Sequence, residues 1–141
     1  MRETGPTSVS LIICESVLNE ATGAASAIRI LDVLKIGRLS NIARFFVLTY
    51  LHSKPLDSGQ HVAQIQLLGL RNGNWVIVAN APPHYFRYSY GIVYSAPGAF
   101  MLTTEFTLDL TTLGELGTFW IQLLVDGILE EQTPLTLQRQ S

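Results

Sequence analysis

The chain has 141 residues, of which 48% are hydrophobic and only 14% are charged. Average domains carry about 25% charged residues, so this composition argues against intrinsic disorder, which requires low hydrophobicity and high charge. A net charge of −2 and a pI near 5.8 argue against a nucleic-acid binder that relies on bulk basicity, and the single cysteine excludes an internal disulfide framework.

Alternation of apolar and polar residues, which is typical of half-buried strands, dominates the chain. In chain order, we predict strands over residues 8–17, 26–36, 45–51, 62–71, 75–79, 100–110, 119–125 and 128–137. Helix is the competing interpretation for residues 19–34, but Gly23 and the β-branched residues there favour strand. We expect at most one short helix, over residues 38–44 or 111–116, and Gly114 and Gly117 favour a loop over the second range.

Turn and breaker residues predict how these strands connect. Asn72-Gly73 and Asp126-Gly127 each supply two residues that tolerate positive φ, so each predicts a tight hairpin turn. Residues 45–51 are apolar on both faces, which is typical of a central strand that is covered on both sides. Pro134 cannot donate a ladder hydrogen bond and therefore predicts an edge strand or a bulge.

About eight or nine short strands with turns between them predict an all-β fold, a single-domain antiparallel β-sandwich of the immunoglobulin-like type. We expect a flexible N-terminus over residues 1–7, the sandwich over residues 8–138 and a tail over residues 139–141. The apolar run at residues 9–14 is too short for a signal peptide, and no stretch approaches the ~18 apolar residues of a membrane-spanning helix. Together with the unpaired Cys14, this predicts a cytoplasmic protein without membrane contact.

Charge is unevenly distributed along the chain. Residues 1–98 contain eight Lys and Arg and five Asp and Glu, which gives a net charge of +3. Residues 99–141 contain one Arg and six Asp and Glu, which gives a net charge of −5 and a total of −2 for the chain. The simplest interpretation is a solvated acidic face on the C-terminal strands. The alternative is an acidic patch that docks on a basic partner, or on the basic region of a second copy, which contains Arg29, Lys35, Arg38 and Arg44.

Residues 82–94 form the most unusual segment, because aromatic residues fill its even positions. If the segment is extended, these side chains share one face and pack a second sheet, line a subunit interface, or stack a small ligand or carbohydrate. Our candidate interaction residues are Phe86, Tyr88, Tyr90, Tyr94 and Trp75. If the segment instead binds a small ligand or carbohydrate, the candidate contact residues are Tyr85, Tyr88, Tyr90 and Trp75.

Catalytic and metal-binding patterns are weak. His52 and His61 flank one loop, so with Asp57 they are the candidate ligands of a transition metal, although histidines at strand ends are usually surface residues. Cys14 lies in an apolar strand and is expected to behave as a small buried hydrophobe rather than as a nucleophile. The sequence contains no phosphate-binding loop, nucleophile elbow or metalloprotease motif, and we predict no cofactor.

Two stretches of the chain share a pattern with other proteins. In the first, Cys14-Glu15 follows an apolar strand and precedes a Ser-x-Ile stretch at Ser26. In the second, a Gly-x-aromatic strand over residues 117–125 ends in the turn Asp126-Gly127. Together they cover about a quarter of the chain and resemble a family of small, uncharacterised bacterial all-β proteins known as a domain of unknown function. The resemblance implies a β-sandwich and assigns no chemistry.

The sequence therefore favours a non-catalytic module that acts through protein–protein or self-association, with a protein partner or a homodimer and without nucleic acid. This interpretation rests on the lack of a catalytic constellation and on analogy at the level of the fold. The first alternative is a small-ligand or carbohydrate-binding module that uses the aromatic segment. The second is a metal-dependent enzyme that uses His52, His61 and Asp57.

Overall fold

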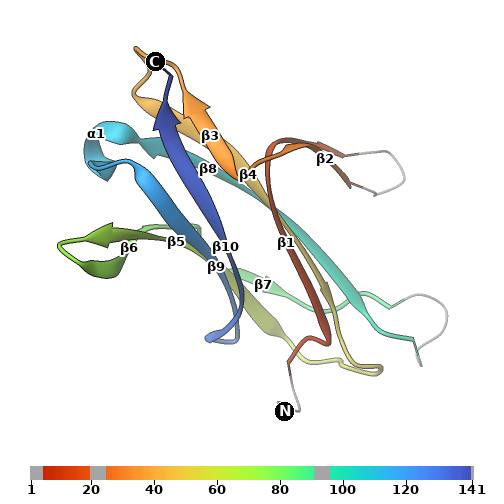
Figure 1. Ribbon diagram of the computed structural model, residues 1–141. Coiled ribbons are helices and arrows are strands. Elements are labelled where there is room, and N and C mark those ends of the chain that lie inside the picture. The colour runs from red at the N-terminus through yellow and green to blue at the C-terminus, as the bar shows by residue number, and fades with distance from the viewer. Residues whose placement is uncertain (1–4, 20–24, 91–95, 141) are drawn as a thin grey trace.

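The computed structural model describes residues 5–19, 25–90 and 96–140. Among them, ten strands and one short helix form two sheets that face each other, which confirms the predicted all-β sandwich (Figure 1). The elements are β1 (Ser8–Asn19), β2 (Ala25–Ile30), β3 (Val33–Ile36), β4 (Ile42–His52), β5 (His61–Arg71), β6 (Asn74–Asn80), β7 (His84–Phe86), β8 (Ala99–Asp109), α1 (Leu110–Leu113), β9 (Gly117–Val125) and β10 (Ile128–Arg139). None of the helical structure described here could cross a lipid bilayer.

The first sheet has the order β2-β1-β4-β8 and is antiparallel throughout. β4 lies between two neighbours, as predicted from its apolar sequence. Phe45 and Val47 point into the sandwich and are fully buried, and Phe45 stacks on Phe106 of β8 with ring centroids 5.3 Å apart. The other face of β4 is only partly covered, since Tyr50 is 38% exposed and the described residues include no third layer over it.

The second sheet has the order β3-β10-β9-β5-β6, and β7 pairs with β5 next to β6. Pro82 and Pro83 separate β6 from β7, because proline lacks the N–H needed to continue the ladder. β3 runs parallel to β10, so the sheet is mixed rather than purely antiparallel as predicted. This pairing begins at Thr136, which leaves Pro134 on an open stretch of β10, in agreement with its predicted edge position.

The strand predicted over residues 26–36 is in fact two strands that belong to different sheets. β2 pairs with β1, and β3 pairs with β10. At the break, the Leu31 N–H donates to the Ile13 carbonyl at 2.8 Å, whereas the Asp32 carbonyl accepts from the Thr136 N–H at 2.9 Å. Successive residues thus bond to opposite layers, and the chain crosses from one sheet to the other here.

Two local predictions can be compared directly with the backbone. Asn72 and Asp126 have φ of 52° and 53° and are each followed by a glycine at φ 80°, which confirms both hairpin turns. The loop that the sequence favours over residues 111–116 is present only at residues 114–116, because the four-residue helix α1 extends to Leu113. Asp109 caps this helix, because its side chain accepts from the Thr111 N–H at 2.9 Å.

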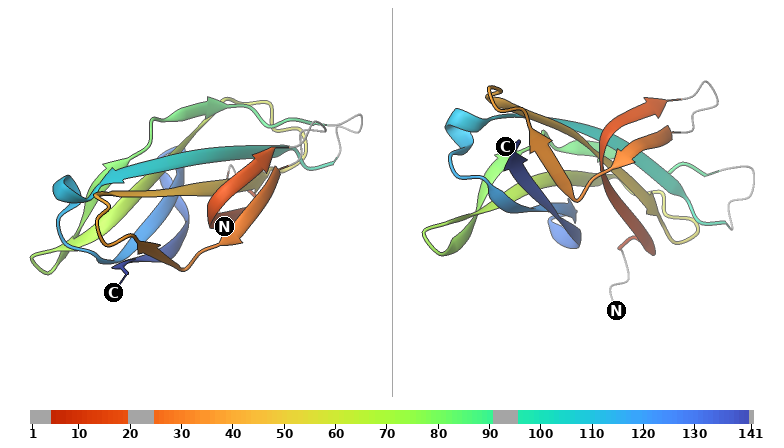
Figure 2. Two further views of the ribbon diagram at one scale, coloured as in Figure 1. Left: turned by 90° about the horizontal axis from the view of Figure 1, so that it is seen from above. Right: turned by 45° about the horizontal axis from the view of Figure 1, so that its top comes forward.

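Figure 2 shows the two layers from two further sides, and the buried hydrophobic side chains of both sheets form one core between them. Its largest fully buried side chains are Phe45, Phe119, Leu51, Ile65, Leu67, Ile121, Leu123, Leu135 and Leu137. The sandwich has two open ends. We call the end with the C-terminus and the β3–β4 turn the upper end, and the end with residues 53–60 and the Asp126-Gly127 turn the lower end (Figure 1).

Candidate functional site

The aromatic candidates are mostly part of the core at the lower end. Phe86 and Tyr88 are buried, and Phe86 stacks on Phe100 with centroids 3.8 Å apart. The Tyr90 hydroxyl donates to the Lys54 carbonyl at 3.0 Å and lies 3.0 Å from the Ser53 hydroxyl. Tyr94 lies outside the described residues. Phe86, Tyr88 and Tyr90 therefore stabilise the lower end, whereas Tyr85 of the same segment is 66% exposed.

Trp75 is half-exposed on β6 and lies far from the tyrosines. It pairs with Leu70 of β5, whereas Tyr85 pairs with Val62, eight residues earlier on the same strand. At the rise of a β-strand this separates the two positions by roughly 26 Å. The ligand-binding hypothesis requires Trp75 and the tyrosines to lie in one site, and the structure does not bring them together.

Of the three candidate metal ligands, the structure brings His61 and Asp57 together but leaves His52 apart. His61 is buried at the start of β5, whereas His52 alternates with the buried Leu51 on β4 and contacts Tyr50 on the outer face of that sheet, with ring centroids 4.7 Å apart. In the described part of the chain, no group of three His, Cys, Asp or Glu side chains could hold a metal ion. Sequence proximity across the loop therefore predicted one partner of His61 correctly, Asp57, and one wrongly, His52.

The true partners of His61 are two carboxylates. Its Nδ1 lies 2.7 Å from Asp126 Oδ2, and its Nε2 lies 3.0 Å from both carboxylate oxygens of Asp57. The carboxylate of Asp126 also accepts from the Val62 N–H at 3.0 Å. Asp57 was among the predicted residues, but Asp126 was missed because it is 65 residues away. Its place at the corner of a hairpin turn was the only available signal.

This network favours a doubly protonated imidazole. Burial alone would lower the pKa of His61, but the hydrogen bonds and charges of Asp126 and Asp57 outweigh it and raise the pKa above its ordinary value of 6.5. An imidazolium donates from both ring nitrogens, so neither keeps a lone pair for a metal or for proton abstraction. The His61 network is a structural link between residues 53–60 and the β9–β10 hairpin.

Cys14 fits the structural interpretation that the sequence favoured. Its side chain is fully buried in β1, and burial raises the pKa of the thiol above its ordinary value of 9.0. Since the thiolate is the nucleophilic form, a buried thiol of this kind is unreactive at neutral pH.

The upper end carries a different arrangement, built on the turn between β3 and β4. The Ser40 N–H donates to the Gly37 carbonyl at 3.0 Å, which closes a β-turn with Arg38 and Leu39 at its two corners. Both side chains point away from the sandwich, and Leu39 is 97% exposed, the most exposed large hydrophobic side chain among the described residues.

Hydrogen bonds from two neighbouring elements fix this turn. The Arg139 guanidinium donates from Nη1 to the Gly37 carbonyl at 3.3 Å and to the Ser40 carbonyl at 2.7 Å. From the helix side, the Leu110 N–H donates to the Asn41 carbonyl at 2.8 Å. The backbone of the turn is therefore held from β10 and from α1, while its two corner side chains remain free to contact another molecule.

Positive charge gathers around the turn. Within the described ranges, Lys35, Arg38 and Arg139 are exposed and form no ion pair, whereas Arg29 pairs with Glu15 at 3.2 Å. Arg44 is likewise neutralised, by Glu105 at 2.6 Å. Acidic residues near the turn are Asp32, in the preceding loop, and Asp109, which pairs with Ile42 at the start of β4. We call this surface the basic tip and define it by its three cations, Lys35, Arg38 and Arg139.

Comparison with known proteins gives one point of reference. No family model matches the chain and no curated protein matches it, so the resemblance to the bacterial family stays a prediction. Among solved structures, the chain is similar to the alkylpurine DNA glycosylase AlkC of Pseudomonas fluorescens bound to DNA containing an abasic site analog, with a TM-score of 0.50 and 13% identity. The match covers 91% of this chain and 30% of that chain. At this identity, the likeness shows the fold.

This neighbour contradicts three predictions: a protein-interaction module, a protein that is not an enzyme, and a protein without a nucleic-acid partner. In the neighbour, a region of this fold is part of an enzyme that is bound to DNA. The net charge of the chain does not exclude a nucleic-acid partner, because a sum over the chain says nothing about local charge. At ordinary salt, charges interact over a Debye length of about 8–10 Å. A local cluster of cations can therefore attract phosphates although the net charge of the chain is −2.

Proposed function

We propose that this chain is a DNA-binding domain and that it holds duplex DNA at the basic tip. The observation that carries the proposal is the set of three exposed cations around one braced turn, none of them in an ion pair within the described ranges. The fold likeness to a chain bound to DNA supports the same partner. Lys and Arg side chains supply most of the contacts through which proteins bind phosphates.

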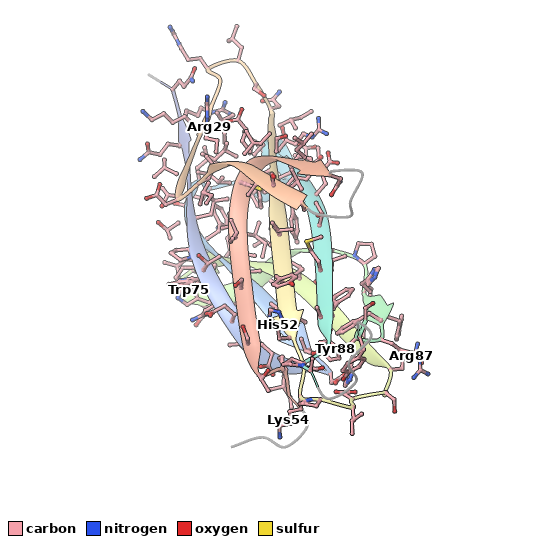
Figure 3. The ribbon with its side chains drawn as sticks, turned by 90° about the vertical axis from the view of Figure 1, so that its right-hand side faces the viewer. Arg29, His52, Lys54, Trp75, Arg87 and Tyr88 are labelled. Atoms are coloured by element: carbon pink, nitrogen blue, oxygen red, sulfur yellow. The ribbon has the colours of Figure 1, made fainter. Side chains whose placement is uncertain are left out.

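The distribution of charge over the sandwich supports one orientation on DNA. Asp57 and Asp126 lie at the lower end, and Glu130 and Glu131 follow directly after the Asp126-Gly127 turn. Figure 3 shows Arg29 at the upper end, opposite Lys54 and Arg87. The carboxylates at the lower end repel phosphates and offset Lys54 and Arg87, whereas the basic tip attracts phosphates through three cations, with Asp109 beside Ile42 as its acidic neighbour.

Binding to DNA also bears on where the protein acts. We propose that it is cytoplasmic, because the free Cys14 stays reduced in that compartment. Three cations make few phosphate contacts, so we expect moderate affinity and little discrimination between sequences of intact duplex.

The test is a titration of a fluorescently labelled duplex of about 20 base pairs with the protein, followed by anisotropy over a range of salt concentrations. If the three cations each neutralise one phosphate, the logarithm of the association constant falls with the logarithm of salt concentration with a slope of about −2.7. The variant Lys54→Glu, at the lower end, is expected to keep the wild-type slope. No binding at low salt, or binding that does not respond to salt, would contradict the proposal.

A further inference from the structure

We infer that Leu39 is a wedge that enters the base stack of duplex DNA, with preference for positions where the stack is already interrupted, such as an abasic site. This inference rests on the proposed function and names the kind of DNA that the same surface selects.

The exposure of Leu39 is the first observation. A leucine that is 97% exposed contributes no burial to the fold, whereas other exposed leucines, such as Leu70 and Leu129, lie on strands and are about half-covered. The turn below Leu39 is held by Arg139 and by the Leu110 N–H, so the side chain is presented on a fixed backbone. A rigid apolar projection loses little conformational entropy when it inserts into a partner.

The chemistry beside Leu39 indicates which partner it enters. Arg38 occupies the adjacent corner of the turn, Lys35 stands on β3, which leads into the turn, and Arg139 stands on the neighbouring strand β10. Proteins that kink or open DNA combine these parts: an apolar side chain is inserted between bases while neighbouring cations hold the phosphates. An apolar pocket on a protein would cover Leu39, but it would also desolvate three cations without a phosphate to pair with them.

The state of the DNA decides the energy of insertion. Separating two stacked base pairs costs free energy, and this cost is least where a base is damaged or missing. A leucine is small compared with a base and has no aromatic face to replace the lost stacking. It is therefore expected to fill an existing gap far better than it opens an intact stack.

The test compares two duplexes of the same sequence, one intact and one with a tetrahydrofuran abasic analogue beside a 2-aminopurine, whose emission reports stacking. Wild-type protein is expected to bind the abasic duplex about tenfold more tightly and to change the 2-aminopurine emission. Leu39→Ala should bind the intact duplex within about twofold of wild type but lose both the preference and the emission change. Leu56→Ala is the matched control, because Leu56 is 70% exposed in the loop at the lower end.

The outcomes separate this inference from the proposed function. If wild type binds both duplexes equally, or if Leu39→Ala keeps the preference or weakens both complexes by the same factor, the wedge is wrong while the DNA-binding proposal stands. If wild type binds neither duplex, both are wrong. Leu39→Ala is expected to have the urea midpoint of wild type, since the side chain buries almost no surface in the fold.

Discussion

The double variant Lys35→Glu, Arg38→Glu is expected to bind duplex DNA roughly ten- to a hundredfold more weakly than wild type at 100 mM salt. Each substitution removes a cation that forms no ion pair in the described structure and places a carboxylate near a phosphate. The salt slope should become shallower by about one for each phosphate that the variant no longer neutralises. Anisotropy titrations at three or more salt concentrations measure both effects.

The matched control is the double variant Lys54→Glu, Arg87→Glu, which makes the same change in net charge at the lower end (Figure 3). Because the Arg87 guanidinium donates to the Ser58 carbonyl, the fold of this control is checked by near-ultraviolet circular dichroism. It is expected to weaken binding far less than the upper-end variant. Equal losses of affinity in the two variants would mean that binding follows net charge alone, and the basic tip would lose its assigned role.

Replacing His61 is expected to have the second large effect, this time on stability. His61→Gln should lower the free energy of unfolding by about 2 kcal/mol at pH 6, because two charge-assisted hydrogen bonds, to Asp126 and Asp57, are removed from a part-buried site. Urea unfolding followed by tryptophan fluorescence measures this difference. His84→Gln, which replaces an exposed imidazole on β7 outside the network, is the control for removal of a histidine.

The difference in the free energy of unfolding between wild type and His61→Gln is expected to depend on pH. Because the folded protein holds the His61 proton more tightly than the unfolded chain, whose pKa is near 6.5, the stabilisation is complete below about pH 6.5. It is lost as the pH rises through the folded-state pKa. The difference between wild type and His61→Gln should therefore shrink from pH 6 to pH 9. A difference that grows over this range would show that the network binds the neutral imidazole.

Local patterns in the sequence predicted the elements well but not their partners. The Asn72-Gly73 and Asp126-Gly127 turns and the central position of β4 follow from residue types alone. Alternation gives the face of a strand that is buried, but it does not give the neighbouring strand. For this reason residues 26–36 were predicted as one strand, although hydrogen bonds at Leu31 and Asp32 direct its two halves to opposite sheets.

The sites could be predicted only in part, for the same reason. His61 and Asp57 are four residues apart and were recognised, whereas Asp126 reaches His61 only through the fold. The sequence offers the basic region that contains Arg29, Lys35, Arg38 and Arg44 only as an alternative, in which it receives the acidic patch of a second copy. Which of these cations are neutralised depends on ion pairs across neighbouring strands, and no spacing rule predicts them.

Duplex DNA is expected to contact the upper end of the sandwich and to leave the lower end free. A titration of ¹⁵N-labelled protein with a short duplex that contains one abasic analogue, followed by amide chemical shifts, locates the contact directly. We expect shifts concentrated at residues 35–41 and 138–140, with those at residues 53–60 and 87–90 unchanged. Shifts centred on the lower end, or none at equimolar DNA and low salt, would mean that DNA does not bind at the basic tip.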